Sequence, residues 1–145
     1  MAGALGALLE RLTQAICRGD AEGAAACFCE DGVYHDGFYG EFGGRAAIAD
    51  MVRRHFHGNA RDFSWTLSDV VEEGGYGYAS YEFSYTSKIA GSEGKRAGFS
   101  GMCKVRLKDG LIERYEEIFE RAQVLARLGF ADERIVKSVR KWAAA

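Results

Sequence analysis

The sequence has 145 residues, the length of one ordinary domain, and a chain of this size buries a hydrophobic core without help from disulfides. Hydrophobic residues at 48% and charged residues at 28% exclude a disordered chain, and 19 basic against 21 acidic residues exclude the basic surface of a nucleic-acid-binding protein. No apolar run approaches the roughly 20 residues that a membrane-spanning helix needs, so we expect neither nucleic acid nor a membrane as a partner.

Four cysteines, Cys17, Cys27, Cys29 and Cys103, permit two disulfides, but a domain of this size does not require them. Cys27 and Cys29 lack the two-residue gap of a zinc knuckle and have no second pair, so we expect reduced, mostly buried thiols. Residues 1–10 are apolar but carry no basic leader, which makes them a poor signal peptide. We therefore expect a cytoplasmic protein.

The first third of the chain is predicted to be helical. Apolar residues at helical spacing indicate a first amphipathic helix that ends near Gly19: Leu5, Leu8, Leu9, Leu12 and Ile16. Asp20 is a good N-cap for a second helix over residues 21–29, which the Glu-Asp-Gly sequence at 30–32 ends.

A short strand at Val33-Tyr34 and a loop rich in glycine and aromatic residues, at 36–44, separate the second helix from the third. The third helix is predicted over residues 45–57, because Ile48, Met51, Val52 and Phe56 share one helical face.

The period then changes from 3.6 to 2, which predicts four strands, over residues 63–71, 76–88, 97–108 and 111–120. Asp109-Gly110 is a hairpin turn. Helices follow at 121–128, where Gly129 stops the first, and at 133–142, where Asp132 caps the second. Helices followed by a strand meander predict a single α+β domain over 1–145, with 131–145 as a helical extension and the helices covering one face of an antiparallel sheet.

Two groups of short motifs resemble the SnoaL-like, nuclear-transport-factor-2-like superfamily. The closing group comprises Phe99-Ser100-Gly101-Met102, Arg106, Asp109-Gly110, Ile112, Tyr115, Glu117, Phe119 and residues 125–129. The upstream group comprises Arg18-Gly19-Asp20, Phe28, residues 31–33, Gly44-Arg45 and Ile48.

The resemblance implies a strongly bent sheet wrapped around three helices, with an internal pocket open at one end. Members of this superfamily include polyketide cyclases, ketosteroid isomerases and epoxide hydrolases, and also non-catalytic subunits, so the fold alone does not give the activity. The resemblance also implies a homodimer formed back to back through the outer face of the sheet.

Glu117 is the main candidate for acid–base chemistry. On the last strand, residues 113, 115, 117 and 119 alternate with 112, 114, 116 and 118, and Tyr115 and Phe119 mark the first set as concave. A carboxyl between two aromatic residues in an apolar pocket has a raised pKa, which suits proton transfer near neutrality. The resemblance places an acid at this point of the last strand, usually Asp. The alternative is a glutamate ion-paired with Arg106 or Arg114.

Asp36 is the second candidate, because it matches the position at the pocket mouth where ketosteroid isomerases carry their general base. The alternative is a turn or cap residue. The positions matching the carbonyl-polarising residues of those isomerases hold Leu12 and Cys103, which donate no strong hydrogen bond, so authentic steroid isomerase chemistry is disfavoured. No Arg-x-Asp lies on the long strand, which disfavours epoxide hydrolysis.

Aromatic residues are abundant enough to wall a pocket as well as to fill a core. The predicted substrate contacts are Tyr34, Trp65, Tyr81, Phe83, Phe99, Cys103, Tyr115 and His55. His55 and His57 are two residues apart at a helix end and face different ways, so we predict no metal site and no cofactor.

The sequence thus predicts a pocket protein for a small apolar ligand, with two roles left open. The first is a cofactor-independent isomerase or cyclase that moves a proton on an apolar ring substrate. The second is a non-catalytic ligand-binding or scaffold protein with the same cavity.

Overall fold

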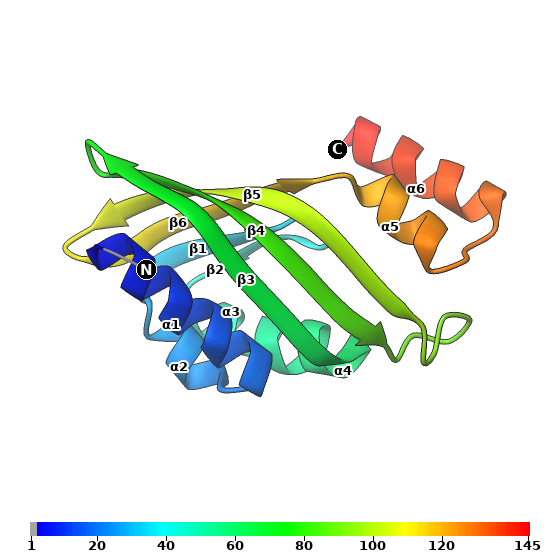
Figure 1. Ribbon diagram of the computed structural model, residues 1–145, viewed down its shortest axis with the longest axis horizontal. Coiled ribbons are helices and arrows are strands. Elements are labelled where there is room, and N and C mark those ends of the chain that lie inside the picture. Colours follow the sequence, from blue (N-terminus) through cyan, green and yellow to red (C-terminus); the bar gives the residue numbers. More distant parts are fainter. Residues whose placement is uncertain (1–2) are drawn as a thin grey trace.

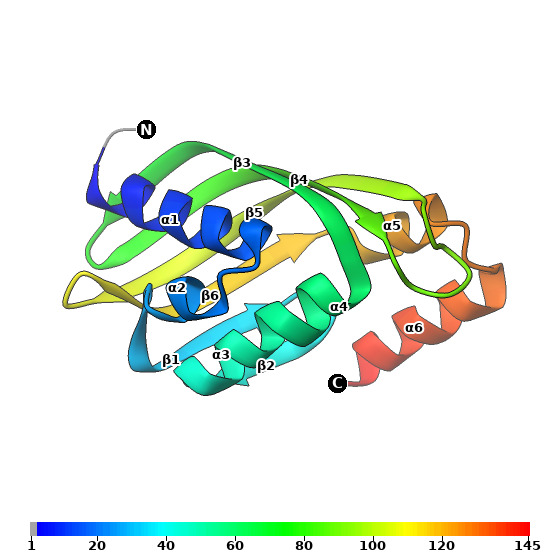
Figure 2. The same ribbon diagram turned by 90° about the horizontal axis from the view of Figure 1, so that it is seen from below.

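The computed structural model describes residues 3–145, so the first two residues of the predicted domain lie outside the described part. A single curled sheet covers five helical segments on its concave face, and two further helices extend from one end of the sheet (Figures 1 and 2). The helical segments are α1 (Ala4–Arg18), α2 (Ala21–Ala25), α3 (Arg45–Met51), the π-helix η1 (Val52–Phe56), α4 (His57–Asn59), α5 (Arg121–Arg127) and α6 (Asp132–Ala144).

The sheet has six strands in the order β2-β1-β6-β5-β4-β3. Their bounds are β1 (Phe28–Asp36), β2 (Gly40–Gly43), β3 (Ala60–Glu73), β4 (Tyr76–Ser87), β5 (Arg96–Lys108) and β6 (Leu111–Phe119). The predicted α+β class and the antiparallel meander from β3 to β6 are confirmed. The parallel pairing of β1 with β6 joins β1 and β2 to this meander, and β2 occupies part of the predicted loop.

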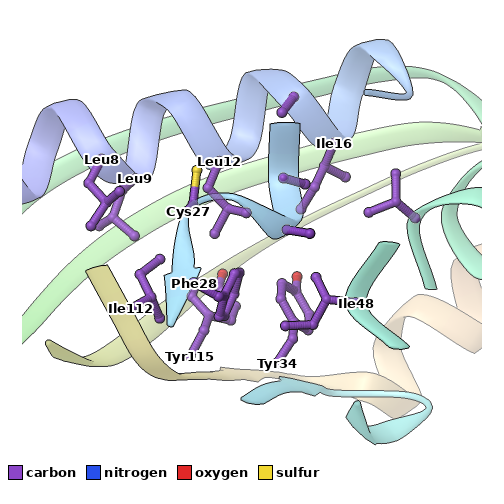
Figure 3. Close-up of a cluster of buried hydrophobic side chains, with 14 of the residues drawn as sticks. Leu8, Leu9, Leu12, Ile16, Cys27, Phe28, Tyr34, Ile48, Ile112 and Tyr115 are labelled. Atoms are coloured by element: carbon purple, nitrogen blue, oxygen red, sulfur yellow. The ribbon is translucent and has the colours of Figure 1, made fainter. Parts of the chain in front are cut away.

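Helix α1 forms where the apolar spacing predicts it. Leu9, Leu12 and Ile16 are fully buried against the sheet, and Gly19 ends the helix with φ +78°. Figure 3 shows these side chains above Phe28 and Tyr115 in the closed core.

The prediction that the second helix runs to residue 29 is wrong, because the chain is already a strand at Phe28. Asp20 does cap α2, since its Oδ1 accepts a hydrogen bond from the Gly23 N–H at 2.9 Å. Phe28 then pairs with Ile112 of β6, and its carbonyl accepts two hydrogen bonds from the Arg45 guanidinium. Tertiary pairing therefore outweighs the helical pattern after Ala25.

The third predicted helix continues to Asn59 but contains one wide π-helical turn. The predicted face residues Ile48, Met51 and Val52 are fully buried. The π-helical turn comprises Val52–Phe56, and turns of this kind are frequent at functional sites. Here the turn brings His55 and Phe56 to a cavity.

A bulge corrects the predicted facing of β6. Arg106 pairs with Arg114 but Leu107 pairs with Ile112, so one extra residue, Glu113, lies in β6. Ile112 is consequently buried in the core, whereas strict alternation from Tyr115 would have placed it on the outer face. Downstream of the bulge the prediction holds, because Ile118 is 79% exposed and Tyr115 is 1% exposed.

The C-terminal helices lie at the end of the sheet, beyond β6. Gly129 follows α5 with φ +80°, as predicted for a helix stop. Helix α6 begins one residue earlier than expected, so Ala131 is its N-cap and Asp132 lies in the first turn, where an acid still favours the helix dipole. No helix within residues 3–145 is long and apolar enough to cross a membrane, and all four cysteines are free thiols.

Candidate functional site

A cavity lies between the concave face of the sheet and the segment η1–α4. It encloses about 580 Å³ of space outside the protein atoms, part of it open to solvent. Its lining is mostly aromatic: Asp36, Phe38, Tyr39, His55, Phe56, Asn59, Ala60, Phe63, Trp65, Tyr81, Phe83, Tyr85, Ile89, Phe99, Glu117 and Phe119. An apolar pocket with a few polar groups is the usual form of a small-molecule site.

The two carboxyls of this cavity come from neighbouring strands. In the parallel pair β1–β6, Tyr34 lies beside Tyr115 and His35 beside Glu116, so the next step along both strands brings Asp36 and Glu117 together. Both side chains line the cavity, and they follow Tyr34 and Tyr115 on the concave face because strand side chains alternate. The parallel pairing of β1 with β6 is therefore what assembles the pair.

The loop after β1 holds both carboxyls through its backbone. The N–H of Gly37 donates to Glu117 Oε1 at 3.1 Å, while the N–H groups of Phe38 and Tyr39 donate to Asp36 Oδ1 at 2.8 and 3.0 Å. Asp36 is thus a turn residue, as the alternative interpretation of the sequence has it, and it also lines the cavity. Gly37 has no Cβ, and one placed there would lie 2.3 Å from the Phe119 ring, so this loop position requires glycine.

Glu117 forms no ion pair with Arg106 or Arg114, the alternative partners named from the sequence. Arg106 pairs with Glu113 at 3.0 Å, and Arg114 pairs with Glu41 and Glu116 on the outer face. Besides the Gly37 N–H, the Tyr115 hydroxyl donates to the Glu117 carboxyl, at 3.5 Å from Oε2.

Burial, together with the negative charge of Asp36, raises the pKa of Glu117 to about 8, although hydrogen bonds from the Gly37 N–H and the Tyr115 hydroxyl oppose the shift. Burial also raises the pKa of Asp36, against the lowering effect of the Tyr39 and Phe38 N–H groups. Two adjacent carboxyls in an apolar cavity cannot readily both ionise, so the raised pKa of Glu117 favours one proton on the pair near neutrality.

Tyr81 reaches this pair because β5 carries a glycine beside it. Gly101 pairs with Tyr81 across β4–β5, and a Cβ on Gly101 would lie 2.4 Å from the Tyr81 hydroxyl oxygen. Tyr81 is 2% exposed, and its hydroxyl has no hydrogen-bond partner within residues 3–145; the same is true of the Trp65 indole N–H. Unpartnered buried polar atoms in a cavity wall are groups that a bound ligand can satisfy.

The structure brings most of the predicted site residues together. The two predicted carboxyls and five predicted contacts line the cavity: Asp36, Glu117, Trp65, Tyr81, Phe83, Phe99 and His55. The other three predicted contacts do not line it. Tyr34, Cys103 and Tyr115 lie beneath it in the core, where Tyr34 and Tyr115 stack at 4.6 Å.

Several lining residues were absent from the predicted site. Strand alternation could have identified Phe63, Tyr85 and Phe119, which share the parity of Trp65, Phe83 and Glu117. Asn59 and Ile89 carry no such signal, since Asn59 ends α4 and Ile89 lies beyond β4. Asn59 contributes through its side-chain amide, which donates to the Tyr39 hydroxyl at 2.8 Å.

Metal ligands do not converge in the described part of the chain. No group of three or more His, Cys, Asp and Glu residues within 3–145 is arranged to hold a metal ion. His55 instead packs against the Tyr39 ring at 4.5 Å and the Phe42 ring at 5.2 Å. Its imidazole therefore forms part of the aromatic wall.

The SnoaL-like domain profile matches residues 9–115, which is most of the chain. The chain belongs to the SnoaL-like domain family. No curated protein matches the sequence.

Solved structures share the fold of this SnoaL-like domain at low sequence identity. A protein from Catenulispora acidiphila DSM 44928 with a ketosteroid isomerase-like fold, in complex with trimethylamine, has a TM-score of 0.77 and 16% identity over 87% of this chain and 95% of that chain. A candidate polyketide cyclase from Xanthomonas campestris pv. campestris has a TM-score of 0.69 and 24% identity over 87% and 96%. An LEH-like epoxide hydrolase from M. tuberculosis has a TM-score of 0.67 and 17% identity over 91% of each chain.

Proposed function

We propose that this SnoaL-like domain is a cofactor-independent isomerase or cyclase that moves a proton on a small, largely apolar ring substrate. The observation that carries the proposal is the Asp36–Glu117 pair at the wall of an aromatic cavity. A pKa near 8 lets Glu117 give or take a proton close to neutral pH, which is the condition for efficient general acid–base catalysis.

In the proposed reaction the ionised carboxylate of the pair removes a proton from a carbon next to a carbonyl, and the electron pair of that C–H bond moves onto the carbonyl oxygen. The Asp36–Glu117 carboxyl pair then returns the proton to a different atom of the enolate, so no proton is gained or lost overall. Tyr81 and Trp65 have unpartnered donors with which to bind the substrate oxygen.

Exchange of Glu117 for Gln tests this role. Any isomerase or cyclase turnover found with enone or polyketide-like substrates should fall by at least about a hundredfold, because general acid–base catalysis contributes about that much. A Glu117→Gln protein that is folded and keeps full turnover would contradict the proposal. Glu72→Gln, an exposed carboxyl on β3, is the matched control.

A non-catalytic ligand-binding protein is the second candidate function. The complex of the Catenulispora acidiphila protein with trimethylamine supports use of this kind of fold for binding a small molecule. Native mass spectrometry of the purified protein separates the two, because a binder retains its ligand unchanged whereas an enzyme converts it.

We also propose that the protein works as a homodimer in the cytoplasm. The outer face of the sheet exposes Met102 (56%) and Ile118 (79%), which are paired on β5 and β6, and an apolar patch of this kind suits a partner sheet. Lys104 and Glu116, also paired across β5 and β6, offer charges for its rim. The four free thiols are consistent with a reducing compartment.

A further inference from the structure

The cavity has carboxyls but no fixed positive charge. Among the described lining residues, Asp36 and Glu117 are acidic and none is Lys or Arg. None of the ion pairs formed within residues 3–145 includes either carboxyl. Arg121 binds the Gly37 carbonyl at 2.9 Å and lies over the Trp142 ring, outside the lining. A buried carboxylate without a counter-charge is costly, so either a proton or a bound cation must balance this pair.

The walls of the cavity suit a cation. Phe63 and Phe83 stack at 6.0 Å, and Phe83 meets Trp65 edge-on at 4.9 Å, so faces and edges of several rings bound one space. Phe56 closes the helical side at 6.2 Å from Trp65. Aromatic faces attract organic cations, most strongly where water is excluded.

An unpartnered oxygen lies beside the carboxyl pair. The Tyr81 hydroxyl is buried in the cavity wall without a hydrogen-bond partner among residues 3–145, and Gly101 gives it the room to reach toward Glu117. A hydroxyl oxygen accepts from an ammonium N–H as readily as it donates. The cavity thus combines two carboxyls, an acceptor oxygen and ring faces around one space.

We propose that the ligand of this cavity carries a compact organic cation, such as a substituted ammonium group, held against the Asp36–Glu117 pair with its alkyl groups on the aromatic walls. This inference rests on the proposed function, since it names the substrate class of the same site. With one proton on the pair, a single negative charge balances a single ammonium, and the remaining carboxyl proton stays available for transfer.

The affinity for a permanent cation should rise with pH. Raising the pH removes the proton from the carboxyl pair and so increases its negative charge. Other titratable groups also face the two carboxyls. These groups are His35 and His55 beside Asp36, and Tyr34, Tyr81, Cys103 and Tyr115 beside Glu117. Burial raises the pKa of each phenol and of the thiol and keeps them uncharged.

Two ligands of the same shape test the charge directly. Choline and 3,3-dimethylbutan-1-ol differ only in a quaternary nitrogen against a quaternary carbon, and calorimetric or NMR titration gives both affinities. At pH 8 we expect choline to bind at least about tenfold more tightly than the alcohol, and we expect this ratio of affinities to fall as the pH is lowered. The double variant Asp36→Asn/Glu117→Gln should lose the preference at pH 8 but keep its affinity for the alcohol, while Glu72→Gln should retain the preference.

If the alcohol binds at pH 8 as tightly as choline, or more tightly, the proposal of a cationic ligand is overturned. Binding of neither compound, or a preference that survives the double variant, would overturn it as well. Each of these outcomes leaves the proposed proton transfer standing, since turnover in Glu117→Gln tests that separately.

Discussion

The concave face of one sheet supports two regions that are built differently. At one end, aliphatic side chains of α1 pack in one cluster with Phe28, Ile112 and Tyr115 and leave the core closed (Figure 3). At the other end, Phe83 and Phe99 meet at 66° and bound an open cavity with two carboxyls. Trp65 and Leu67 contact both regions and mark the boundary. Flexible aliphatic chains from a long helix fill the curve of the sheet, whereas rigid rings packed edge to face leave space.

The largest effect expected from this difference is on stability. Leu12→Ala removes a fully buried side chain from the closed region and should lower the free energy of unfolding by about 3 kcal/mol. Phe63→Ala, in the wall of the open region, should cost about 1 kcal/mol, because its ring already borders the cavity and solvent. Denaturant unfolding of both variants measures this, and equal losses would contradict the division of the concave face.

Glu117→Gln should change how stability depends on pH. The folded-state pKa is raised to about 8 from an ordinary value of 4.5, so the stabilising contribution of the protonated carboxyl is complete below pH 4.5. It is lost as the pH rises to 8, because the unfolded chain releases this proton first. The wild type should therefore lose about 3 kcal/mol more than Glu117→Gln between pH 5 and 8. If the unfolding free energies of the wild type and of Glu117→Gln depend on pH in the same way, the Glu117 carboxyl is not held neutral in the folded protein.

Gly101→Ala should disturb the cavity more than the core. The new methyl group would overlap the Tyr81 ring and its hydroxyl, which would have to move away from Glu117. We expect a loss of about 1 to 2 kcal/mol in unfolding free energy and a changed pKa of Glu117. Gly98→Ala is the matched control on the same strand, since its nearest neighbour lies at 3.5 Å. A similar response from both variants would mean that Tyr81 does not depend on this glycine.

Ile118→Lys should have the smallest effect on folding. Its side chain is 79% exposed on the outer face, so the unfolding free energy of the monomer should change by less than about 0.5 kcal/mol. The proposed dimer should nevertheless weaken, and analytical ultracentrifugation at several concentrations measures its dissociation. A dimer of unchanged affinity would place the interface elsewhere.

Regular periodicity made much of this molecule predictable. The stripe from Leu5 to Ile16 predicts α1, and alternation along β3 to β6 predicts both the meander and the inward direction of Glu117. The bulge at Glu113 is not encoded in that alternation, which is why Ile112 was placed on the wrong face.

Long-range pairing accounts for what the sequence did not reveal. Nothing local to residues 26–36 indicates a parallel strand beside β6, yet this pairing shortens α2 and brings Asp36 to Glu117. The same pairing places Tyr34 and Tyr115 beneath the cavity and not in its wall. Parity can predict which face a residue occupies, but it does not show where along that face the packed core ends and the cavity begins.

The central claim is that Glu117 belongs to a proton-sharing carboxyl pair at the wall of the open region. The most direct test is to follow the side-chain carboxyl carbon of Glu117 by NMR in labelled protein from pH 4 to 10, with Glu117→Gln for assignment. Titration with a midpoint near 8, accompanied by a second response from Asp36, is the result that this structure predicts. A single midpoint near 4.5 would show an ordinary solvated glutamate and would contradict both the pair and the chemistry proposed for it.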